Sequence, residues 1–365
     1  MHLERLHLTN FKNYQEVDIQ FSSRINVLVG KNGSGKTNLL DAIHYLSMTR
    51  SAFSVSDQQV IRLGQPFFVA RGHFNRNNSV QELLAFLQNG TKKVFREGGL
   101  DYLKMSDHIG KYPVVMITPD DTDLVKEGGE ARRKFFDSII AQMDKNYLED
   151  LMLYNHSLKQ RNALLKMFQE SGSSDYLALE AYDRQLAKLG TSLFQKRSEF
   201  VLDFLPVFQK YYKFIVADEE ADLEYHSLLK SKEFIQGLND TRQRDLVMAR
   251  TSFGIHKDDY LFSLGSGDLK RLGSQGQQKS FVIALKLTQY ELIARFKGDK
   301  PILLLDDIFD KLDDIRIARL LELIKSDLGQ LFITDARPDR TGELLKAIDV
   351  KAAVFQIDKG NVQPL

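Results

Sequence analysis

The segment GKNGSGKT at residues 30–37 constrains the fold of this chain more than any other stretch. It matches the pattern G-x-x-x-x-G-K-[ST] in full, follows the apolar run INVLV, and precedes the helix-patterned run NLLDAIHYL. A strand, a glycine-rich turn and a helix in this order form a phosphate-binding loop, or P-loop. The sequence therefore predicts an α/β nucleotide-binding unit with a helix from Lys36 to about Met48.

The residue types of the loop suit ATP and Mg²⁺. Glycines let backbone N–H groups point inward around the β-phosphate. Lys36 supplies a positive charge to the β- and γ-phosphates, and the Thr37 hydroxyl ligates Mg²⁺. We therefore expect a nucleotide site formed by Gly30, Lys31, Asn32, Gly33, Ser34, Gly35, Lys36 and Thr37.

An acidic motif follows another apolar run, in PILLLDD at residues 301–307. In P-loop enzymes an acidic residue at the end of such a strand holds the Mg²⁺ shell, and Asp306 fits this role. Asp307 would then face the γ-phosphate and orient or deprotonate the attacking water. Lys36 and Asp307 are thus the candidate catalytic residues. A solvated acidic turn is the alternative interpretation.

A third motif is LGSQGQQKSF at residues 272–281, where two glycines precede a long helix-patterned run. A helix start of this kind binds phosphate through its backbone N–H groups. Ser274 and the backbone of Gly276 and Gln277 would contact the γ-phosphate of ATP held by another copy of the chain. The alternative is an ordinary helix after a hairpin, with Ser274 as its N-cap.

Composition bounds the function classes. The 365 residues suffice for one large or two modest domains, and the net charge of +1 gives no general argument for a polyanion partner. The absence of cysteine excludes disulfides, thiol catalysis and cysteine-ligated metals. We find no signal-peptide pattern and no apolar run near the roughly 20 residues that cross a bilayer, so we expect a cytoplasmic protein without a membrane partner.

The sequence predicts that the chain has three structural regions. Residues 1–128 are strand-rich, with turns at Asn77-Asn78 and Gly98-Gly99, and form the first part of an ATPase head. Residues 129–212 show helical periodicity and predict an arm whose two long helices meet at a tip in residues 171–174. Residues 213–365 complete the head. There we expect a hairpin over DYLFSLGSGDLKRL, a helix from about Gln277, a helix from Asp313 to Ser326 and a buried strand in QLFITD.

The P-loop, the SQGQQ segment and the LLLDD strand, in this order, resemble the head of an ABC-type ATPase. Within that class the chain resembles the RecF family of bacterial recombination mediators along nearly its whole length. The resemblance rests on LTNFKNY, GKNGSGKTNLLDAIHYL, TRSAF, TPDDTDLVKEGGEARRKFFD, LKQRNALL, GIHKDD, SQGQQKSFVIALKL and LLLDDIFDKLD.

The resemblance implies an ATP-dependent head-to-head dimer in which the signature segment, residues 274–278, meets the ATP of the partner. It implies binding of gapped or single-stranded DNA without sequence preference, and slow, DNA-dependent ATP hydrolysis that acts as a switch. It implies work with RecO and RecR, and through them RecA, in replication restart and the SOS response. Asn38 would close the start of the P-loop helix, Asp313 would lie at the dimer seam, and Lys12 would reach the nucleotide.

Two places depart from the family pattern. After the strand QLFIT, Asp335 stands where further hydroxyl residues are usual and ABC heads carry histidine. Either Thr334 makes the γ-phosphate contact and Asp335 points away, or the switch is tuned differently. In addition, DKLD replaces the more usual Ser-x-Leu-Asp.

The DNA surface is the least defined prediction. Basic clusters on the arm are Arg132–Lys134, Lys159 with Arg161, and Lys196 with Arg197. Each is a candidate phosphate contact or a solvated helix face. GIHKDD at residues 254–259 is interpreted as a turn before the hairpin rather than a metal or nuclease site.

Two other functions remain open. One is the motor subunit of a membrane transporter, which the arm, the signature segment and Asp335 disfavour. The other is a clamp or scaffold that binds ATP without significant turnover, which the sequence does not separate from a slow ATPase.

Overall fold

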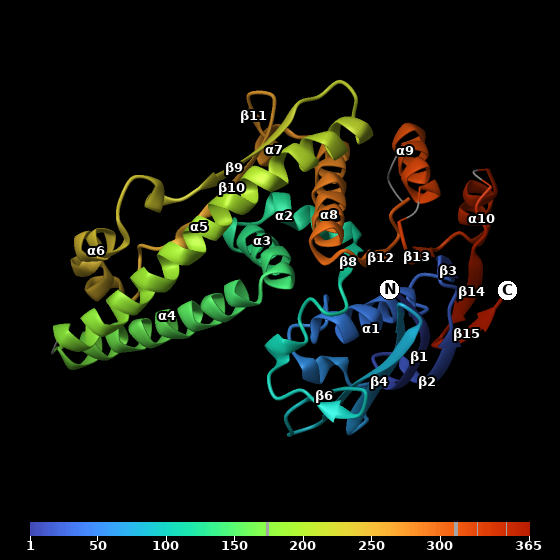
Figure 1. Cartoon of the computed structure of the whole chain (residues 1–365), viewed down its shortest axis with the longest axis horizontal. Helices are drawn as coiled ribbons and strands as arrows, with labels where there is room; N and C mark the ends of the chain where they lie inside the picture. The colour runs from blue at the N-terminus through green and yellow to red at the C-terminus, as the bar shows by residue number, and fades with distance from the viewer. Residues whose placement is uncertain (173–174, 310–312, 327, 348) are drawn as a thin grey trace. The chain divides into compact units, whose positions relative to one another are not determined.

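A computed structural model describes residues 1–172, 175–309, 313–326, 328–347 and 349–365 (Figure 1). The chain folds into two compact units, and each unit is built from segments that are distant in sequence. The first unit comprises residues 1–121, 214–217 and 279–365. The second comprises residues 122–213 and 218–278.

The parallel sheet of the first unit carries the P-loop. Its strand order is β15-β14-β3-β13-β12-β8, and all neighbours are parallel except the β14–β15 hairpin. β3, β12 and β13 are uniformly buried and mostly apolar strands, as expected for a sheet covered on both faces. The strands are β3 (Ile25–Val29), β8 (Val114–Ile117), β12 (Ile302–Leu305), β13 (Leu331–Asp335), β14 (Ala353–Asp358) and β15 (Asn361–Pro364).

An antiparallel sheet with the order β2-β1-β4-β5-β6-β7 forms the other layer of this unit. Buried and half-buried residues alternate along β4, because one face is covered by the core and the other is more open to solvent. Its turn at Asn77 and Asn78 has positive φ values of 52° and 63°, which Asn tolerates. The strands are β1 (His2–Phe11), β2 (Tyr14–Gln20), β4 (Phe67–Arg76), β5 (Ser79–Gln88), β6 (Val94–Glu97) and β7 (Leu100–Asp101).

Helix α1 (Lys36–Met48) packs against both of these sheets. Its buried side chains Leu39, Ile43 and Leu46 join one apolar core with residues of the antiparallel and parallel sheets. The burial of this helix fixes the P-loop, which immediately precedes it. Three further helices complete the unit: α8 (Gln275–Lys297), most of which lies in it, α9 (Asp314–Lys325) and α10 (Pro338–Ala347).

The second unit is dominated by helices. α4 and α5 lie side by side, and the ion pairs Arg161–Asp183 and Lys196–Asp144 connect them. A small sheet, β11-β10-β9, packs on α3 through the stacked rings of Phe136 and Tyr260. The elements are α2 (Asp123–Lys126), α3 (Gly129–Met143), α4 (Lys145–Ser171), α5 (Tyr176–Ile215), α6 (Phe234–Met248), α7 (Leu269–Leu272), β9 (Ala221–His226), β10 (Asp259–Leu264) and β11 (Gly267–Asp268).

Most expected elements are confirmed, with small corrections. The hairpin expected over DYLFSLGSGDLKRL ends at Asp268, because the Asp268 side chain accepts from the N–H groups of Lys270 and Arg271 and starts α7. α8 begins at Gln275, two residues earlier than expected. Ser173 and Ser174 of the expected arm tip lie outside the described residues.

The compact units group residues 218–278 with the helices, whereas the sequence prediction returned to the head at residue 213. A compact unit need not coincide with a separately folding domain. The boundaries 1–128, 129–212 and 213–365 therefore remain a prediction. No described helix is both long and apolar enough to span a membrane.

Candidate nucleotide-binding site

The predicted site residues of the first unit meet at the carboxyl edge of the parallel sheet. Gly30 follows β3, Thr334 lies near the end of β13, and Asp306 follows β12. These three strands are neighbours in the sheet, so their ends converge although the segments are far apart in sequence. The carboxyl edge of such a sheet is where α/β folds bind ligands.

Glycines give the P-loop its shape at three positions. Gly33 and Gly35 have φ values of +77° and +121°, a conformation that side chains disfavour. At Gly30 a Cβ atom would lie 2.2 Å from the carbonyl oxygen of Ile357 in β14. The loop thus lies directly against the backbone of the neighbouring strand, and no other residue fits there without displacement.

Lys36 is buried, with 4% of its surface exposed. Its Nζ donates to the carbonyl oxygens of Gly30 at 2.8 Å and Lys31 at 3.3 Å. The ammonium therefore lies across the mouth of the loop, among the backbone groups that would surround a phosphate.

Thr37 and Asp306 face each other across the site. The Thr37 hydroxyl lies 3.0 and 2.9 Å from the two carboxylate oxygens of Asp306. Thr334 donates its hydroxyl to Asp306 Oδ1 at 2.7 Å, so the carboxylate is oriented from two sides. A hydroxyl and a carboxylate are hard oxygen donors that suit Mg²⁺, and they lie close enough to ligate one ion. Burial raises the pKa of Asp306, while hydrogen bonds from Thr334 and Thr37 oppose that shift.

Asp307 turns the chain sharply at the end of β12. Its φ is +43°, a left-handed conformation that Asp adopts more readily than most residues. The backbone N–H of Asp307 donates to Thr334 Oγ1 at 2.9 Å. Thr334 therefore links both acidic residues, a role that its position after an apolar run did not reveal.

The side chains of Thr334 and Asp335 have different partners in the structure. Asp335 accepts hydrogen bonds from the backbone N–H of Arg337 and from the hydroxyl of Thr341 in α10. Its carboxylate is therefore bound to the segment that follows β13, while the Thr334 hydroxyl contacts Asp306. This arrangement matches the alternative in which Asp335 is turned away from the site.

Lys12 has a protein partner in the structure, and its expected contact with the nucleotide remains a prediction. Its Nζ forms an ion pair at 2.6 Å with Asp41 of α1, whose carboxylate is fully buried. The neighbouring Asn13 and Tyr14, which the sequence analysis did not single out, contact the P-loop directly. They lie in the LTNFKNY segment, but their role depends on a contact between segments distant in sequence.

The signature segment lies in the second unit, or at its boundary, and forms a capping box. The N–H of Gln277 donates to Ser274 Oγ at 3.2 Å, and the N–H of Ser274 donates to Gln277 Oε1 at 2.7 Å. Gln277 Nε2 also donates to Glu219 at 2.9 Å. Ser274 is exposed and Gly276 partly so. The N-cap geometry is therefore present, and the contact with a partner's ATP remains a prediction.

The D-loop prediction is described only in part. Asp310, Lys311 and Leu312 lie outside the described residues. Asp313 is the N-cap of α9, where its side chain accepts from the N–H of Arg316 at 2.9 Å.

Three arginines of the predicted DNA surface are buried, which corrects that prediction. Arg132 forms a bidentate pair with Asp259, both contacts at 2.8 Å. Arg161 and Arg197 are 0% and 2% exposed. Arg161 pairs with Asp183 and Asp245, and Arg197 pairs with Asp137 and Asp258. Consecutive basic letters in the sequence do not reveal such partners.

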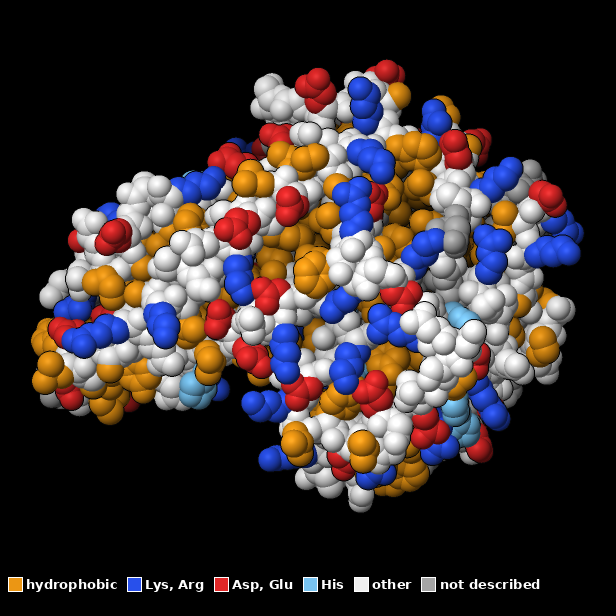
Figure 2. Space-filling model, viewed as in Figure 1, with side chains coloured by type: hydrophobic (Ala, Val, Ile, Leu, Met, Phe, Trp, Pro, Cys, Tyr) orange, Lys and Arg blue, Asp and Glu red, His pale blue; other side chains and the backbone are white. Residues whose placement is uncertain are grey.

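The remaining basic residues of these clusters lie among acidic ones. Lys134 and Lys196 pair with Glu130 and Asp144 on the surface, and Lys159 is exposed. Along α4 and α5, Lys and Arg side chains are interspersed with Asp and Glu on the face that Figure 2 shows.

GIHKDD forms a turn that supplies partners to the buried arginines. Asp258 and Asp259 bind Arg197 and Arg132. His256 contacts the Tyr154 hydroxyl at 2.8 Å and the carbonyl of Thr251 at 3.1 Å. Within the described part of the chain no group of His, Asp and Glu is arranged to hold a metal ion. The interpretation of this segment as a turn is confirmed.

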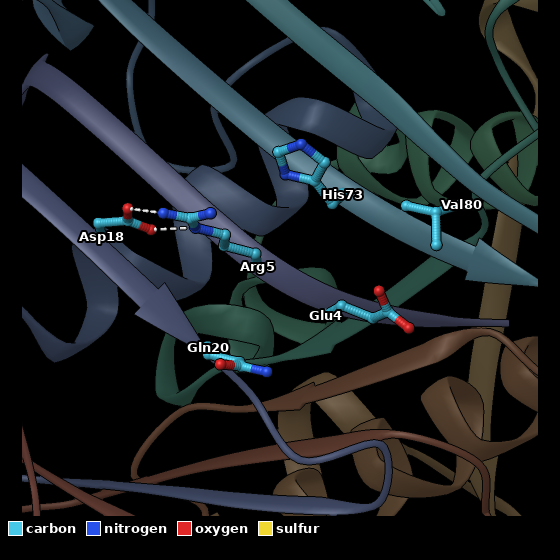
Figure 3. A pocket seen from close by; sticks show the side chains of 6 residues that line it. All are labelled: Glu4, Arg5, Asp18, Gln20, His73 and Val80. Carbon is cyan, nitrogen blue, oxygen red and sulfur yellow. Dashed lines mark hydrogen bonds and ion pairs between the residues drawn. The ribbon is translucent and has the colours of Figure 1, made fainter.

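A polar hollow of about 560 Å³ lies on the solvent face of the antiparallel sheet (Figure 3). Arg5 and Asp18 form an ion pair across it, with Arg5 Nε 2.7 Å from Asp18 Oδ1. It contains none of the predicted site residues. We therefore assign the candidate nucleotide site to the P-loop rather than to this hollow.

Comparison with known proteins identifies the family. A family model described as the RecF/RecN/SMC N-terminal domain matches residues 2–98. A "DNA replication and repair protein RecF" from Cytophaga hutchinsonii is 46% identical over 365 residues, spanning 100% of this chain and 97% of that protein. The chain belongs to the RecF family. Another RecF, from Flavobacterium johnsoniae, is 45% identical over 359 residues, 98% of this chain and 100% of that protein.

Solved structures agree with this assignment. The recombination mediator protein RecF with ATP, from the RecFOR pathway, is similar with a TM-score of 0.90 and 28% identity, covering 100% of this chain and 97% of that one. The Smc head from Pyrococcus furiosus, at 18% identity and a TM-score of 0.57, shares the fold, with 100% of this chain and 96% of that chain covered. The expected fold, an ABC-type ATPase head carrying a helical arm, is confirmed.

Proposed function

We propose that this RecF-family chain is an ATP-dependent DNA-binding protein of recombinational repair and replication restart. The observation that carries the proposal is that the side chains of Thr37, Asp306 and Thr334 are hydrogen-bonded to one another beside a complete P-loop. The names of its relatives, and a RecF structure with ATP among its structural neighbours, support the same function. The cell compartment would be the cytoplasm.

The chain's own residues would bind and orient ATP. The N–H groups of residues 30–37 and the Lys36 ammonium would surround the phosphates, and Asn38 would close the start of α1. Thr37 and Asp306 would hold Mg²⁺, which neutralises phosphate charge when bound. Asp307 would orient or deprotonate the attacking water, giving slow turnover.

Dimerisation would follow from the signature segment. Phosphate oxygens of a partner's ATP would replace Gln277 Oε1 as acceptor at the Ser274 N–H, with Gly276 and Gln277 completing the contact. ADP lacks the γ-phosphate, so the dimer would loosen after hydrolysis. The ATP-bound dimer would hold gapped or single-stranded DNA and would act with RecO and RecR to load RecA and support the SOS response.

Light scattering on a short gapped duplex tests the proposal. Asp307→Asn with ATP should give a dimer on DNA that falls to monomer or free DNA with ADP. Lys36→Met should remove both ATP binding and the dimer, because the P-loop loses the ammonium that lies among its backbone carbonyls. A monomer with either nucleotide in Asp307→Asn would refute the switch.

A turnover assay separates the ATPase from a scaffold that only binds ATP. Turnover in the wild type that is lost in Asp307→Asn supports hydrolysis. Equal turnover in both would remove Asp307 from the catalytic role.

A further inference from the structure

The turn between β1 and β2 contacts the P-loop from outside. This turn consists of Lys12 and Asn13, and Lys12 is anchored to the buried carboxylate of Asp41 in α1 at 2.6 Å. The N–H of Ala52 and the hydroxyl of Ser51 also donate to Asp41, at 2.7 and 2.6 Å. The turn is therefore fixed to α1, the helix that directly follows the P-loop.

Two consecutive P-loop carbonyls receive hydrogen bonds from this side. Asn13 Nδ2 donates to the carbonyl oxygen of Ser34 at 3.1 Å, and Asn13 Oδ1 accepts from Asn38 Nδ2 at 2.8 Å. The Tyr14 hydroxyl donates to the carbonyl oxygen of Gly35 at 2.9 Å.

The close approach also constrains Gly35. A Cβ atom there would lie 2.5 Å from Asn13 Nδ2 and 2.9 Å from the Tyr14 hydroxyl. The glycine is thus required by the two side chains as well as by its φ of +121°. Tyr14 is fully buried. Burial raises its pKa, so the hydroxyl keeps its proton and remains a donor.

The consequence follows from the geometry of the peptide bond. In a planar trans peptide the C=O and the next N–H point in opposite directions. A Ser34 carbonyl held outward therefore directs the Gly35 N–H inward, and a Gly35 carbonyl held outward directs the Lys36 N–H inward. These are amides that a P-loop presents to phosphate. The N–H groups of Gly360 and Leu39 also donate to the Ser34 and Gly35 carbonyls, at 3.2 and 3.0 Å, so Asn13 and Tyr14 add side-chain donors to peptides that backbone bonds already hold.

We propose that Asn13 and Tyr14 are positioning residues that hold the Gly35 and Lys36 amides toward the nucleotide phosphates. This inference rests on the proposed ATP-binding function and adds two residues from outside the loop to it. Neither touches the phosphates, because both act through backbone carbonyls.

The test is ATP affinity, measured by calorimetry on the full chain with Tyr14→Phe and Asn13→Ala. Tyr14→Phe removes one hydroxyl and keeps the buried ring, and we expect roughly a threefold to tenfold higher Kd for ATP, the usual effect of one hydrogen bond. Asn13→Ala should weaken ATP at least as much. Adenosine, which lacks phosphates, should bind each variant as it binds the wild type.

Tyr45→Phe is the matched control. Tyr45 is also fully buried in the same core, and its hydroxyl donates to Asp57 at 2.9 Å rather than to the P-loop. It should bind ATP like the wild type. Equal losses in Tyr14→Phe and Tyr45→Phe would mean a general effect on the core and would overturn the inference. So would wild-type ATP affinity in both Tyr14→Phe and Asn13→Ala.

The inference and the proposed function fail in different ways. Suppose that the wild type binds ATP through Lys36 and that Tyr14→Phe and Asn13→Ala both keep the wild-type ATP affinity. That result refutes only the positioning role. Failure of the wild type itself to bind ATP refutes the proposed function.

Discussion

Arg161 offers the sharpest test of whether the arm's arginines are structural. Its side chain is fully buried, with Nε 2.6 Å from Asp183 and Nη1 2.8 Å from both Asp245 and the Thr251 hydroxyl. Replacing it by Met keeps the approximate length but removes the cation bound to the buried Asp245 and leaves Asp183 with the longer contact to Arg242, at 3.3 Å. Breaking a buried pair in this way costs about 3–5 kcal/mol.

The expected loss is large enough to measure by thermal unfolding. A unit of 150–250 residues shifts by about 2–4 °C per kcal/mol, so Arg161→Met should lower the Tm by about 6–20 °C. Hydrogen exchange should speed up at α4 and α6, which the Arg161–Asp245 pair connects. Lys166→Met is the control, because Lys166 and Glu170 are 70% and 67% exposed, and such pairs contribute about 0–1 kcal/mol.

The opposite result would refute the reasoning. If Arg161→Met keeps the wild-type Tm and exchange pattern but loses salt-dependent DNA retention, Arg161 contacts phosphate and the buried pairs are wrongly assigned. If Lys166→Met destabilises equally, burial is not the cause of the effect.

Other expected outcomes test separate features. Burial lowers the pKa of both His108 and His256 to about 4, below the ordinary value of 6.5. Between these two pH values the unfolded state binds more protons than the folded state, so the stability should fall as the pH drops from about 6.5 to 4. The Tm measured as a function of pH checks this. Gly30→Ala, which forces a Cβ against β14, should weaken ATP binding at least about tenfold, whereas Gly128→Ala, in open space, should leave it unchanged. Thr334→Val removes a buried bond to Asp306 and should raise the Mg²⁺ concentration for half-maximal ATP binding by about tenfold, with Thr334→Ser near wild type.

Local patterns in the sequence predicted the elements and the P-loop well. The loop is a continuous segment whose strand, glycines and helix carry their own signals, and Lys36–Met48 forms α1 as expected. The apolar run before Asp306 likewise identified the strand whose end carries the acidic residue. Each of these predictions depends on neighbours within a few residues.

Contacts between distant segments could not be predicted in the same way. Arg161 and Arg197 looked like solvated cations because their carboxylate partners lie elsewhere in the chain, up to 84 residues away for Asp245. Asn13 and Tyr14 lie in the LTNFKNY segment, but their role at the P-loop appears only when the β1–β2 turn meets it. Pairing of this kind depends on the tertiary fold, which charge patterns and periodicity do not contain.

The P-loop is completed by the end of the chain, and this has a consequence for synthesis. Asp306 lies 269 residues after Thr37, and the still later Ile357 and Gly360 close on Gly30 and on the carbonyl of Ser34. A chain emerging from the ribosome presents residues 30–37 long before these partners exist. Because such non-local contacts form late, a nascent chain should gain its nucleotide affinity only after the β14–β15 hairpin has been made. An incomplete copy would then be unable to engage ATP and dimerise prematurely.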